Sequence, residues 1–141
     1  MCDTEKCFIM LCNMETEQEC IDRSLFGDKA KRLDLLGEIR PGDIGFLLNV
    51  ERDELIGVFR ACSEAGLHIE SDAWKGRFAA QVRVELVSEL KRIGDATYIL
   101  TKAGVGMGQL ASGMPAPAYP VHSPEVLKNL LEQFGISEST T

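Results

Sequence analysis

Three apolar segments separated by short polar links constrain the fold of this chain more than any other feature. Residues 44–50, 54–61 and 78–87 are rich in aliphatic and aromatic side chains, and turn residues flank them. The Pro-Gly-Asp triplet at 41–43 predicts a type II turn, because proline suits the second position of that turn and glycine suits the third. The polar link at 51–53 predicts a hairpin between the first two segments. These features predict a sheet of short, mostly antiparallel strands.

Glycines inside two of these strands predict that the sheet is strongly curved. Gly45 and Gly57 lie within apolar strand sequence, where glycine marks a bulge or the close approach of another backbone. Residues 6–13 form a nearly continuous apolar run, which predicts a strand covered on both faces. Residues 96–100 are rich in β-forming side chains and predict a further strand.

Two segments predict helices that flank the strands. Residues 15–25 have helical composition with acidic side chains near the start, and Gly27 is expected to end this helix in a left-handed conformation. Residues 124–134 follow the capping Ser123 and begin with proline. Their apolar residues recur at helical spacing and predict a buried face: Val126, Leu127, Leu130, Leu131 and Phe134. The expected fold class is α+β, a curved β-barrel rich in antiparallel pairs, with one helix near the N-terminus and another at the C-terminus.

Length and charge limit the number of domains and the kind of partner. A chain of 141 residues is expected to form a single domain over residues 1–141, with a flexible polar tail at 135–141. The net charge is −7, and residues 1–28 alone hold seven acidic and two basic side chains. Proteins that track nucleic acid broadly are usually basic, because phosphate contacts dominate their affinity. The charge therefore argues against an extended nucleic-acid track, while it permits one small nucleotide site.

The cysteine pattern and the N-terminal sequence predict a reduced, cytoplasmic protein. The five cysteines are an odd number, no Cys-x-x-Cys pair occurs, and no histidine lies near the first four in the sequence, so we expect no metal site and no cofactor. The glycine-rich residues 104–108 resemble a dinucleotide loop only faintly, because prolines interrupt any helix after them. The N-terminus lacks the basic-then-apolar pattern of a signal peptide, and no uncharged stretch is long enough to span a bilayer, so no membrane contact is expected.

The order of short motifs strongly resembles the development and cell death (DCD) domain. The matching motifs are a strand at 8–13, Leu-Phe-Gly at 25–27, Pro-Gly-Asp at 41–43 leading into Phe-Leu-Leu-Asn at 46–49, Leu-Ile-Gly-Val-Phe at 55–59, Ala-Trp at 73–74 and Arg-Phe-Ala-Ala-Gln-Val-Arg-Val at 77–84. The last motif is the most specific, and the resemblance covers about residues 6–134. Gly-Asp-Ile-Gly after Pro41 and Ala79 in place of proline depart from the family pattern, and residues 103–118 match no family motif.

The Pro-Gly-Asp turn that leads into a strand and the Gly-Val-Phe of the next strand are also similar to the wider PUA, EVE and YTH group of small barrels. This likeness implies a PUA-like barrel that reads RNA or a modified base through an aromatic-lined pocket. Resemblance to the modified-base readers of that group implies ligand contacts from Cys12 and Asn13 at the end of the first strand and from Phe26 after the first helix. The DCD domain itself implies signalling and protein association.

Trp74 is the sharpest site candidate among the residues themselves. It is the lone tryptophan of the chain and lies in a long connection between strands. Such an indole can stack on a planar base or clamp a peptide side chain, and it can equally plug one end of the barrel. Asn13 could hydrogen-bond a base edge, or it could cap the helix that follows it.

Basic side chains near these residues are candidate phosphate contacts. Lys29, Lys31 and Arg32 form the only basic cluster of the sequence, and Arg77 follows Trp74 closely. A phosphate beside the pocket could be held there, whereas a charged loop is more often simply solvated.

No arrangement of residues indicates an enzyme. No nucleophile and base occur in a supporting local motif, and His68 and His122 lie far apart in the sequence. Two hypotheses remain, namely a module that binds RNA or a modified nucleobase and a signalling adaptor that binds a protein partner. We favour the first, because one local base site needs few phosphate contacts and therefore suits an acidic protein.

Overall fold

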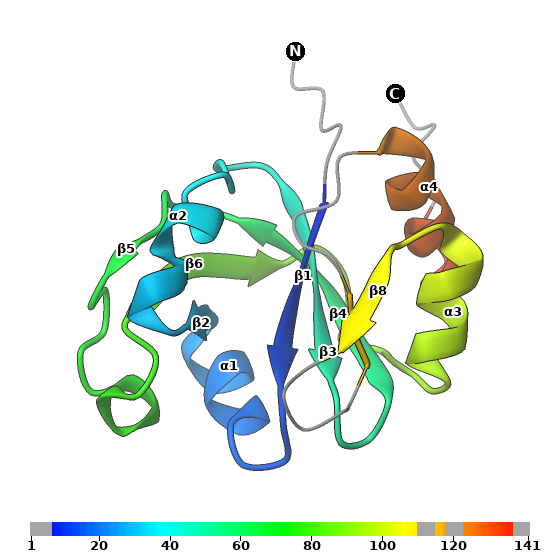
Figure 1. The fold of residues 1–141 in the computed structure, drawn as a ribbon. Helices are drawn as coiled ribbons and strands as arrows, with labels where there is room; N and C mark the ends of the chain where they lie inside the picture. Colours follow the sequence, from blue (N-terminus) through cyan, green and yellow to red (C-terminus); the bar gives the residue numbers. More distant parts are fainter. Residues whose placement is uncertain (1–6, 110–114, 118–122, 137–141) are drawn as a thin grey trace.

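The core of the molecule is a strongly curved sheet that forms a nearly closed barrel (Figure 1). The computed structural model describes residues 7–109, 115–117 and 123–136. The strands of the barrel wall are neighbours in the order β1 (Cys7–Cys12), β3 (Ile44–Asn49), β4 (Glu54–Ala61), β6 (Ala80–Leu86) and β2 (Leu25–Asp28). The short strand β5 (Gly66–Leu67) pairs with β6, and β7 (Arg92–Ile93) pairs with β4.

Antiparallel pairing dominates the barrel, as the sequence predicts. The pairs β3–β4, β4–β6 and β2–β6 are antiparallel, whereas β1 runs parallel to β3. A parallel neighbour needs a long crossover, and residues 13–43 supply it with α1 (Glu17–Arg23), β2, the short helical turn η1 (Ala30–Arg32) and α2 (Leu33–Leu36). The predicted α+β barrel is confirmed.

Side chains that point into the barrel form the first of two apolar cores. Alternation along each strand sends every second side chain inward, and the strand residues of this core are buried: Phe8, Met10, Phe26, Leu47, Ile56, Phe59, Val82 and Val84. Leu25, which precedes Phe26 in β2, belongs to the same core. Phe59, Val82 and Val84, which lie in the apolar segments that predict strands, are all among these buried residues.

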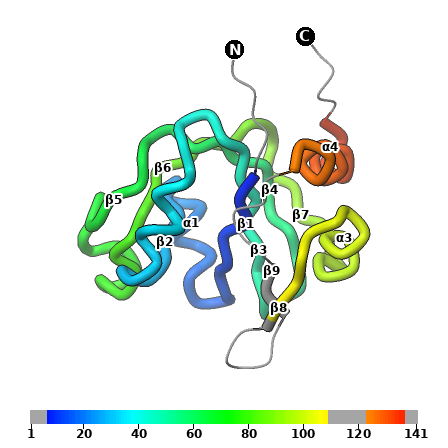
Figure 2. The backbone as a smooth tube through the Cα atoms, turned by 45° about the horizontal axis from the view of Figure 1, so that its top comes forward, coloured from blue at the N-terminus to red at the C-terminus, as the bar shows by residue number. Residues whose placement is uncertain are grey.

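The second core lies between the outer face of the sheet and two helices, α3 (Ala96–Ala103) and α4 (Pro124–Gln133). Figure 2 shows these helices side by side against β1, β3 and β4, on the side of the barrel away from α1. The Phe46 ring of β3 stacks on Phe134 with centroids 5.8 Å apart. Strand β1 is therefore buried on both faces, which explains its nearly continuous apolar sequence.

The two strand glycines serve different purposes in the curved sheet. Gly57 is the extra residue of a bulge in β4, because Phe46 pairs with Val58 while Leu47 pairs with Ile56. Its φ of 69° suits glycine. At Gly45 the close approach is made by a side chain rather than by a backbone, since a Cβ atom there would lie 2.3 Å from the Phe8 ring.

The two predicted helices are present, but the first one ends earlier than expected. Helix α4 begins as predicted, with the Ser123 hydroxyl accepting a hydrogen bond from the Val126 N–H, 3.3 Å. Helix α1 ends at Arg23, where Ser24 adopts the left-handed conformation with φ of 50°. Gly27 was expected to end this helix and instead lies within β2, where its lack of a side chain leaves room for the Trp74 indole.

The strand predicted at residues 96–100 is wrong, because these residues form the first turns of α3. This segment is rich in β-forming side chains, but hydrogen bonds from another part of the chain cap it as a helix. The Asp53 carboxylate accepts hydrogen bonds from the Thr97 N–H, 2.8 Å, and the Thr97 hydroxyl, 2.7 Å, and the Asp53 carbonyl accepts one from the Ala96 N–H, 3.0 Å. These bonds satisfy the first donors of the helix, which would otherwise be unpaired.

The glycine- and proline-rich segment 103–118 lies only partly within the described residues. Its described part contains a short antiparallel pair, β8 (Met107–Gln109) with β9 (Pro115–Pro117). Residues 110–114 and 118–122, which include His122, lie outside the described residues, as does the predicted tail beyond residue 136.

Candidate ligand-binding site

Trp74 lies in a stretch of left-handed backbone. The short helical turn η2 (Ala73–Gly76) contains consecutive positive φ angles, namely 48° at Trp74, 57° at Lys75 and 79° at Gly76. A bulky residue rarely adopts this conformation, and each non-glycine residue held there costs on the order of 1–3 kcal/mol. The Arg77 backbone N–H donates to the Trp74 carbonyl, 3.1 Å, and closes the turn. Strain of this kind concentrates at ligand-binding sites, so the turn marks Trp74 as the first candidate.

The Trp74 indole is sealed between β2 and the turn that precedes α1. It is 2% exposed, and its Nε1–H donates a hydrogen bond to the Thr16 carbonyl, 3.2 Å. The ring lies so close to Gly27 that a Cβ atom there would be only 2.5 Å from it. The Phe78 ring meets the indole edge-on with centroids 5.7 Å apart. A ligand can therefore stack on the indole only after the indole moves.

Asn13 organises the chain between β1 and α1. Its Oδ1 atom accepts hydrogen bonds from the Glu15 N–H, 2.9 Å, the Thr16 N–H, 2.9 Å, and the Thr16 hydroxyl, 3.0 Å. The side chain therefore caps this turn, and it also fixes the residue whose carbonyl holds the indole. Asn13 is half-buried, so its remaining polar atoms are within reach of solvent.

Cys12 and Phe26 are placed inside the protein. Phe26 is fully buried in the barrel, edge-on to Phe8 and Phe59 with centroid distances of 5.9 and 4.9 Å. Cys12 is buried beside Cys20, and a hydrogen bond to that thiol together with burial raises the pKa of the Cys12 thiol. A buried thiol of this kind is unreactive. The structure thus brings Cys12, Phe26 and Trp74 into one apolar cluster, and contact of these residues with a ligand stays a prediction.

The predicted phosphate-binding residues lie at the surface in two places. Lys29, Lys31 and Arg32 occupy the exposed segment from the end of β2 through η1, where the Arg32 guanidinium pairs with Asp28, 2.9 Å. Arg77 follows the Trp74 turn, pairs with Glu15, 3.1 Å, and lies 5.4 Å from the centroid of the Phe78 ring. Phosphate binding by these side chains stays a prediction.

An ion-pair network that the sequence does not reveal lies beside this cluster. Glu17, which is 8% exposed, accepts from the Arg92 guanidinium, 2.6 Å, and from the Asn49 amide, 2.8 Å. Arg92 also pairs with Glu54, 3.1 Å. The network ties the first turn of α1 to β3, β4 and β7. The contact with Arg92, aided by Asn49, holds the pKa of the Glu17 carboxyl below its ordinary value of 4.5, against the burial that would raise it.

This depressed pKa predicts acid-sensitive stability. A carboxyl with a lowered folded-state pKa stabilises the fold above its unfolded pKa, and this contribution is lost as the pH falls through the folded value. We expect the urea midpoint to fall as the pH drops below the unfolded pKa of about 4.3, and to fall less in Glu17→Gln. The exposed Asp22 of α1 offers a control, since Asp22→Asn should retain the wild-type decline. An identical decline in Glu17→Gln and wild type would contradict this role of Glu17.

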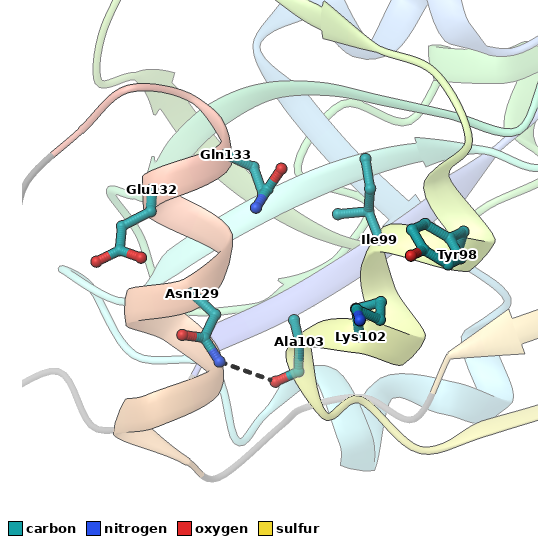
Figure 3. A pocket seen from close by; sticks show the side chains of 7 residues that line it. All are labelled: Tyr98, Ile99, Lys102, Ala103, Asn129, Glu132 and Gln133. Carbon is teal, nitrogen blue, oxygen red and sulfur yellow. Dashed lines mark hydrogen bonds between the residues drawn. The ribbon is translucent and has the colours of Figure 1, made fainter.

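A hollow of about 330 Å³ lies between α3 and α4, apart from the Trp74 cluster (Figure 3). The Asn129 amide of α4 donates to the Ala103 carbonyl at the end of α3, 3.3 Å, across its floor. The residues that line it are Tyr98, Ile99, Lys102, Ala103, Asn129, Glu132 and Gln133. None of the ligand-binding or phosphate-binding residues predicted from the sequence is among them.

Two further features bear on the kind of site. Among residues 7–109 and 123–136, no three His, Cys, Asp or Glu side chains are arranged to hold a metal ion. No helix in the described part of the chain is long and apolar enough to cross a membrane. The cytoplasmic location expected from the sequence stays a prediction.

The family model of the development and cell death domain matches residues 6–99. A B2 protein of Daucus carota is 40% identical over 84 residues, which cover 55% of this chain and 41% of that protein. The DCD domain-containing protein NRP-B of Glycine max is 38% identical over 84 residues, covering 55% of this chain and 26% of that protein. The match thus spans less than half the length of these curated relatives, and the extension of the resemblance to residue 134 stays a prediction.

Solved YTH domains share this fold. The YTH domain of Zygosaccharomyces rouxii MRB1 protein, in complex with N6-methyladenosine RNA, matches with a TM-score of 0.67 at 13% identity, covering 97% of this chain and 91% of that one. The Pho92 YTH domain in complex with m6A matches with a TM-score of 0.69 at 10% identity, covering 98% and 91%. Identities this low establish a common fold and leave the ligand open.

Proposed function

The chain belongs to the development and cell death domain family, and we propose that it is a non-enzymatic module that binds RNA by holding one planar, modified base at Trp74. The observation that carries this proposal is the strained turn that fixes the lone indole beside the aromatic Phe78. Base stacking on an indole is sequence-tolerant and stabilises a complex by about 1–3 kcal/mol per base. The fold shared with YTH domains solved in complex with methylated RNA supports the same ligand class.

Asn13 supplies the polar part of the proposed site. Its Oδ1 atom is engaged by the turn before α1. In the part of the chain that the structure describes, no side chain or carbonyl accepts a hydrogen bond from its amide NH₂ group. That group has two donors, and they remain for the acceptor atoms of a base edge.

The charged groups around Trp74 suit binding rather than catalysis. Glu19 accepts from the Trp74 backbone N–H, 2.9 Å, and Glu15 is paired with Arg77. A general base needs an available carboxylate or imidazole within reach of a substrate proton, whereas these carboxylates are engaged in structural contacts.

The net charge of −7 constrains the mode of binding. A protein that neutralises many phosphates shows a steep loss of affinity with salt, whereas a site for one base makes few phosphate contacts and shows a shallow one. We therefore expect a shallow salt dependence, with Lys29, Lys31, Arg32 and Arg77 contributing one or a few contacts.

Titration with short RNAs tests this function, with Trp74 emission as the readout. Because the chain has one tryptophan, any change in emission reports on this site. The panel contains single nucleosides and RNA oligomers in methylated and unmethylated forms. We expect a saturable change with the RNA that carries a modified base and a smaller response to its unmodified counterpart.

A matched pair of variants locates the response. Asn13→Ser keeps an oxygen that can cap the turn but removes the amide donors, and loss of one such hydrogen bond should weaken binding by about two- to tenfold. Asn129→Ser, in the hollow between α3 and α4, should leave the affinity unchanged. No response to any RNA of the panel, or equal affinity of Asn13→Ser and wild type, would disprove base recognition here.

A protein-interaction role is the second candidate, and the surface of α3 favours it. Tyr98 is 64% exposed, and the Lys102 ammonium lies 5.8 Å from the centroid of its ring. Exposed tyrosine is enriched where proteins bind other proteins. If the protein binds no RNA in the titration, this surface of α3 is the candidate contact for a protein partner.

A further inference from the structure

The connection that carries Trp74 is fixed at both ends by one buried side chain. Gln81 of β6, which is buried, accepts from the Glu70 N–H, 2.7 Å, and donates to the Glu70 carbonyl, 3.0 Å. The same amide nitrogen donates to the Phe78 carbonyl, 2.9 Å. Residues 70 and 78 are thus attached to β6 and to each other through Gln81. Residues 71–77 form a loop between two fixed points.

Between these points, polar contacts of the loop to other elements run to one face of α1 and to the turn before it. Glu19 and Arg23 are four residues apart and therefore lie on the same side of α1, and Glu15 lies in the turn before this helix. Glu15 pairs with Arg77, 3.1 Å. Glu19 accepts from the Trp74 backbone N–H, 2.9 Å, and Arg23 pairs with Asp72, 3.2 Å. Arg23 also pairs with Glu70. We call this set of contacts the α1 clasp.

The α1 clasp is built from groups that solvent and salt can reach. The Arg23 side chain is 29% exposed and its partner Asp72 is 81% exposed. Ion pairs of this kind are individually weak and are screened by salt. The loop that they restrain is strained at Trp74 and Lys75, which both have positive φ. Apart from the packing of Ala73 and Trp74 in the barrel core, this strained segment is held between its two fixed ends by weak contacts, which is the construction of a lid.

We propose that residues 71–77 are a lid that the α1 clasp holds closed over the Trp74 indole, and that its opening creates the binding-competent state. The role of this opening in binding rests on the proposed function, whereas the opening itself does not. Opening exposes the indole and leaves the Thr16 carbonyl, which accepts from the indole N–H in the closed state, available to an N–H of a base. The closed conformation is therefore autoinhibited.

Acrylamide quenching of the Trp74 emission measures the opening without any ligand. We expect quenching of the wild-type protein to rise with added salt, because salt weakens the clasp. In low salt, Arg23→Gln should raise the quenching constant about two- to fivefold, in line with the loss of exposed ion pairs. In high salt, the difference between the two proteins should shrink.

Two further variants keep the test independent of general unfolding. Glu19→Gln retains an acceptor for the Trp74 N–H and should raise quenching less than Arg23→Gln does. Arg60→Gln removes an exposed ion pair with Glu85 between β4 and β6 and should leave quenching at the wild-type value. Circular dichroism checks that each variant is folded at the temperature of measurement.

The lid is disproved if Arg23→Gln and Arg60→Gln quench alike, or if salt does not change the quenching of the wild type. The outcome is separate from that of the RNA titration. A protein whose lid opens but which binds no RNA contradicts only the proposed function. A protein that binds RNA with equal affinity in wild type and Arg23→Gln contradicts only the lid.

Discussion

Phe59→Ala is expected to lower the free energy of unfolding by about 3–5 kcal/mol, the range for removing a large aromatic side chain from a packed core. Phe59 is 2% exposed inside the barrel and meets Phe26 edge-on at 4.9 Å. Its removal leaves a cavity between β4 and β2 that the surrounding strands cannot fill by collapse. Urea denaturation followed by circular dichroism measures the loss.

Lys31→Ala is the control for this experiment. Lys31 is exposed in η1, so its truncation should change the stability by less than about 0.5 kcal/mol. Equal losses in the two variants would mean that the core has been assigned to the wrong residues.

Gly27→Ala is expected to have the second-largest effect, a loss of about 1–3 kcal/mol from overpacking. The added methyl would lie 2.5 Å from the Trp74 indole and 3.3 Å from the Phe78 Cβ. Because the nearer atoms belong to the indole, the indole must shift outward. We therefore expect the Trp74 emission to move to longer wavelength as the ring meets water, in addition to the fall in stability.

Gly66→Ala provides a matched control on the other side of the same strand. Gly27 and Gly66 both pair with Gln81 of β6, one from β2 and the other from β5. A Cβ atom at Gly66 would meet nothing closer than the Ile69 side chain at 3.9 Å. Its substitution should leave the emission unchanged, and a shift of equal size in both variants would contradict the close packing of Trp74 on Gly27.

The parts of the fold that the sequence predicts are those specified by local pattern. Helix α4 combines a capping Ser123 with apolar residues at helical spacing, and the β3–β4 hairpin combines apolar strands with a polar link. Local pattern did not predict α3, because the start of this helix is stabilised by a residue far away in the sequence. The Asp53 carboxylate that binds Thr97 lies 44 positions earlier. Gly27 was misread for the same reason, since the group that requires a glycine there is Trp74.

The candidate site shows the same difference between features that local pattern predicts and features that depend on long-range contacts. Trp74 stood out because it is the lone tryptophan in a long connection, and Asn13 because its position at the end of the first strand resembles a ligand-contacting position of the modified-base readers. The contacts that position Trp74 and the first turn of α1 join distant parts of the chain: Trp74 with Thr16 at a separation of 58, and Arg92 with Glu17 at 75. No spacing rule relates such pairs, so the clasp and the Glu17 network become visible only in three dimensions.

The indole N–H resonance of Trp74 in a two-dimensional ¹⁵N–¹H NMR spectrum tests base recognition at this residue directly. A chain with one tryptophan gives one such signal, and its proton is the one donated to the Thr16 carbonyl. We expect this signal to shift saturably as an RNA oligomer with a modified base is added, and to shift less with the unmodified oligomer. An indole signal that stays in place through the whole titration with both oligomers would contradict base recognition at Trp74.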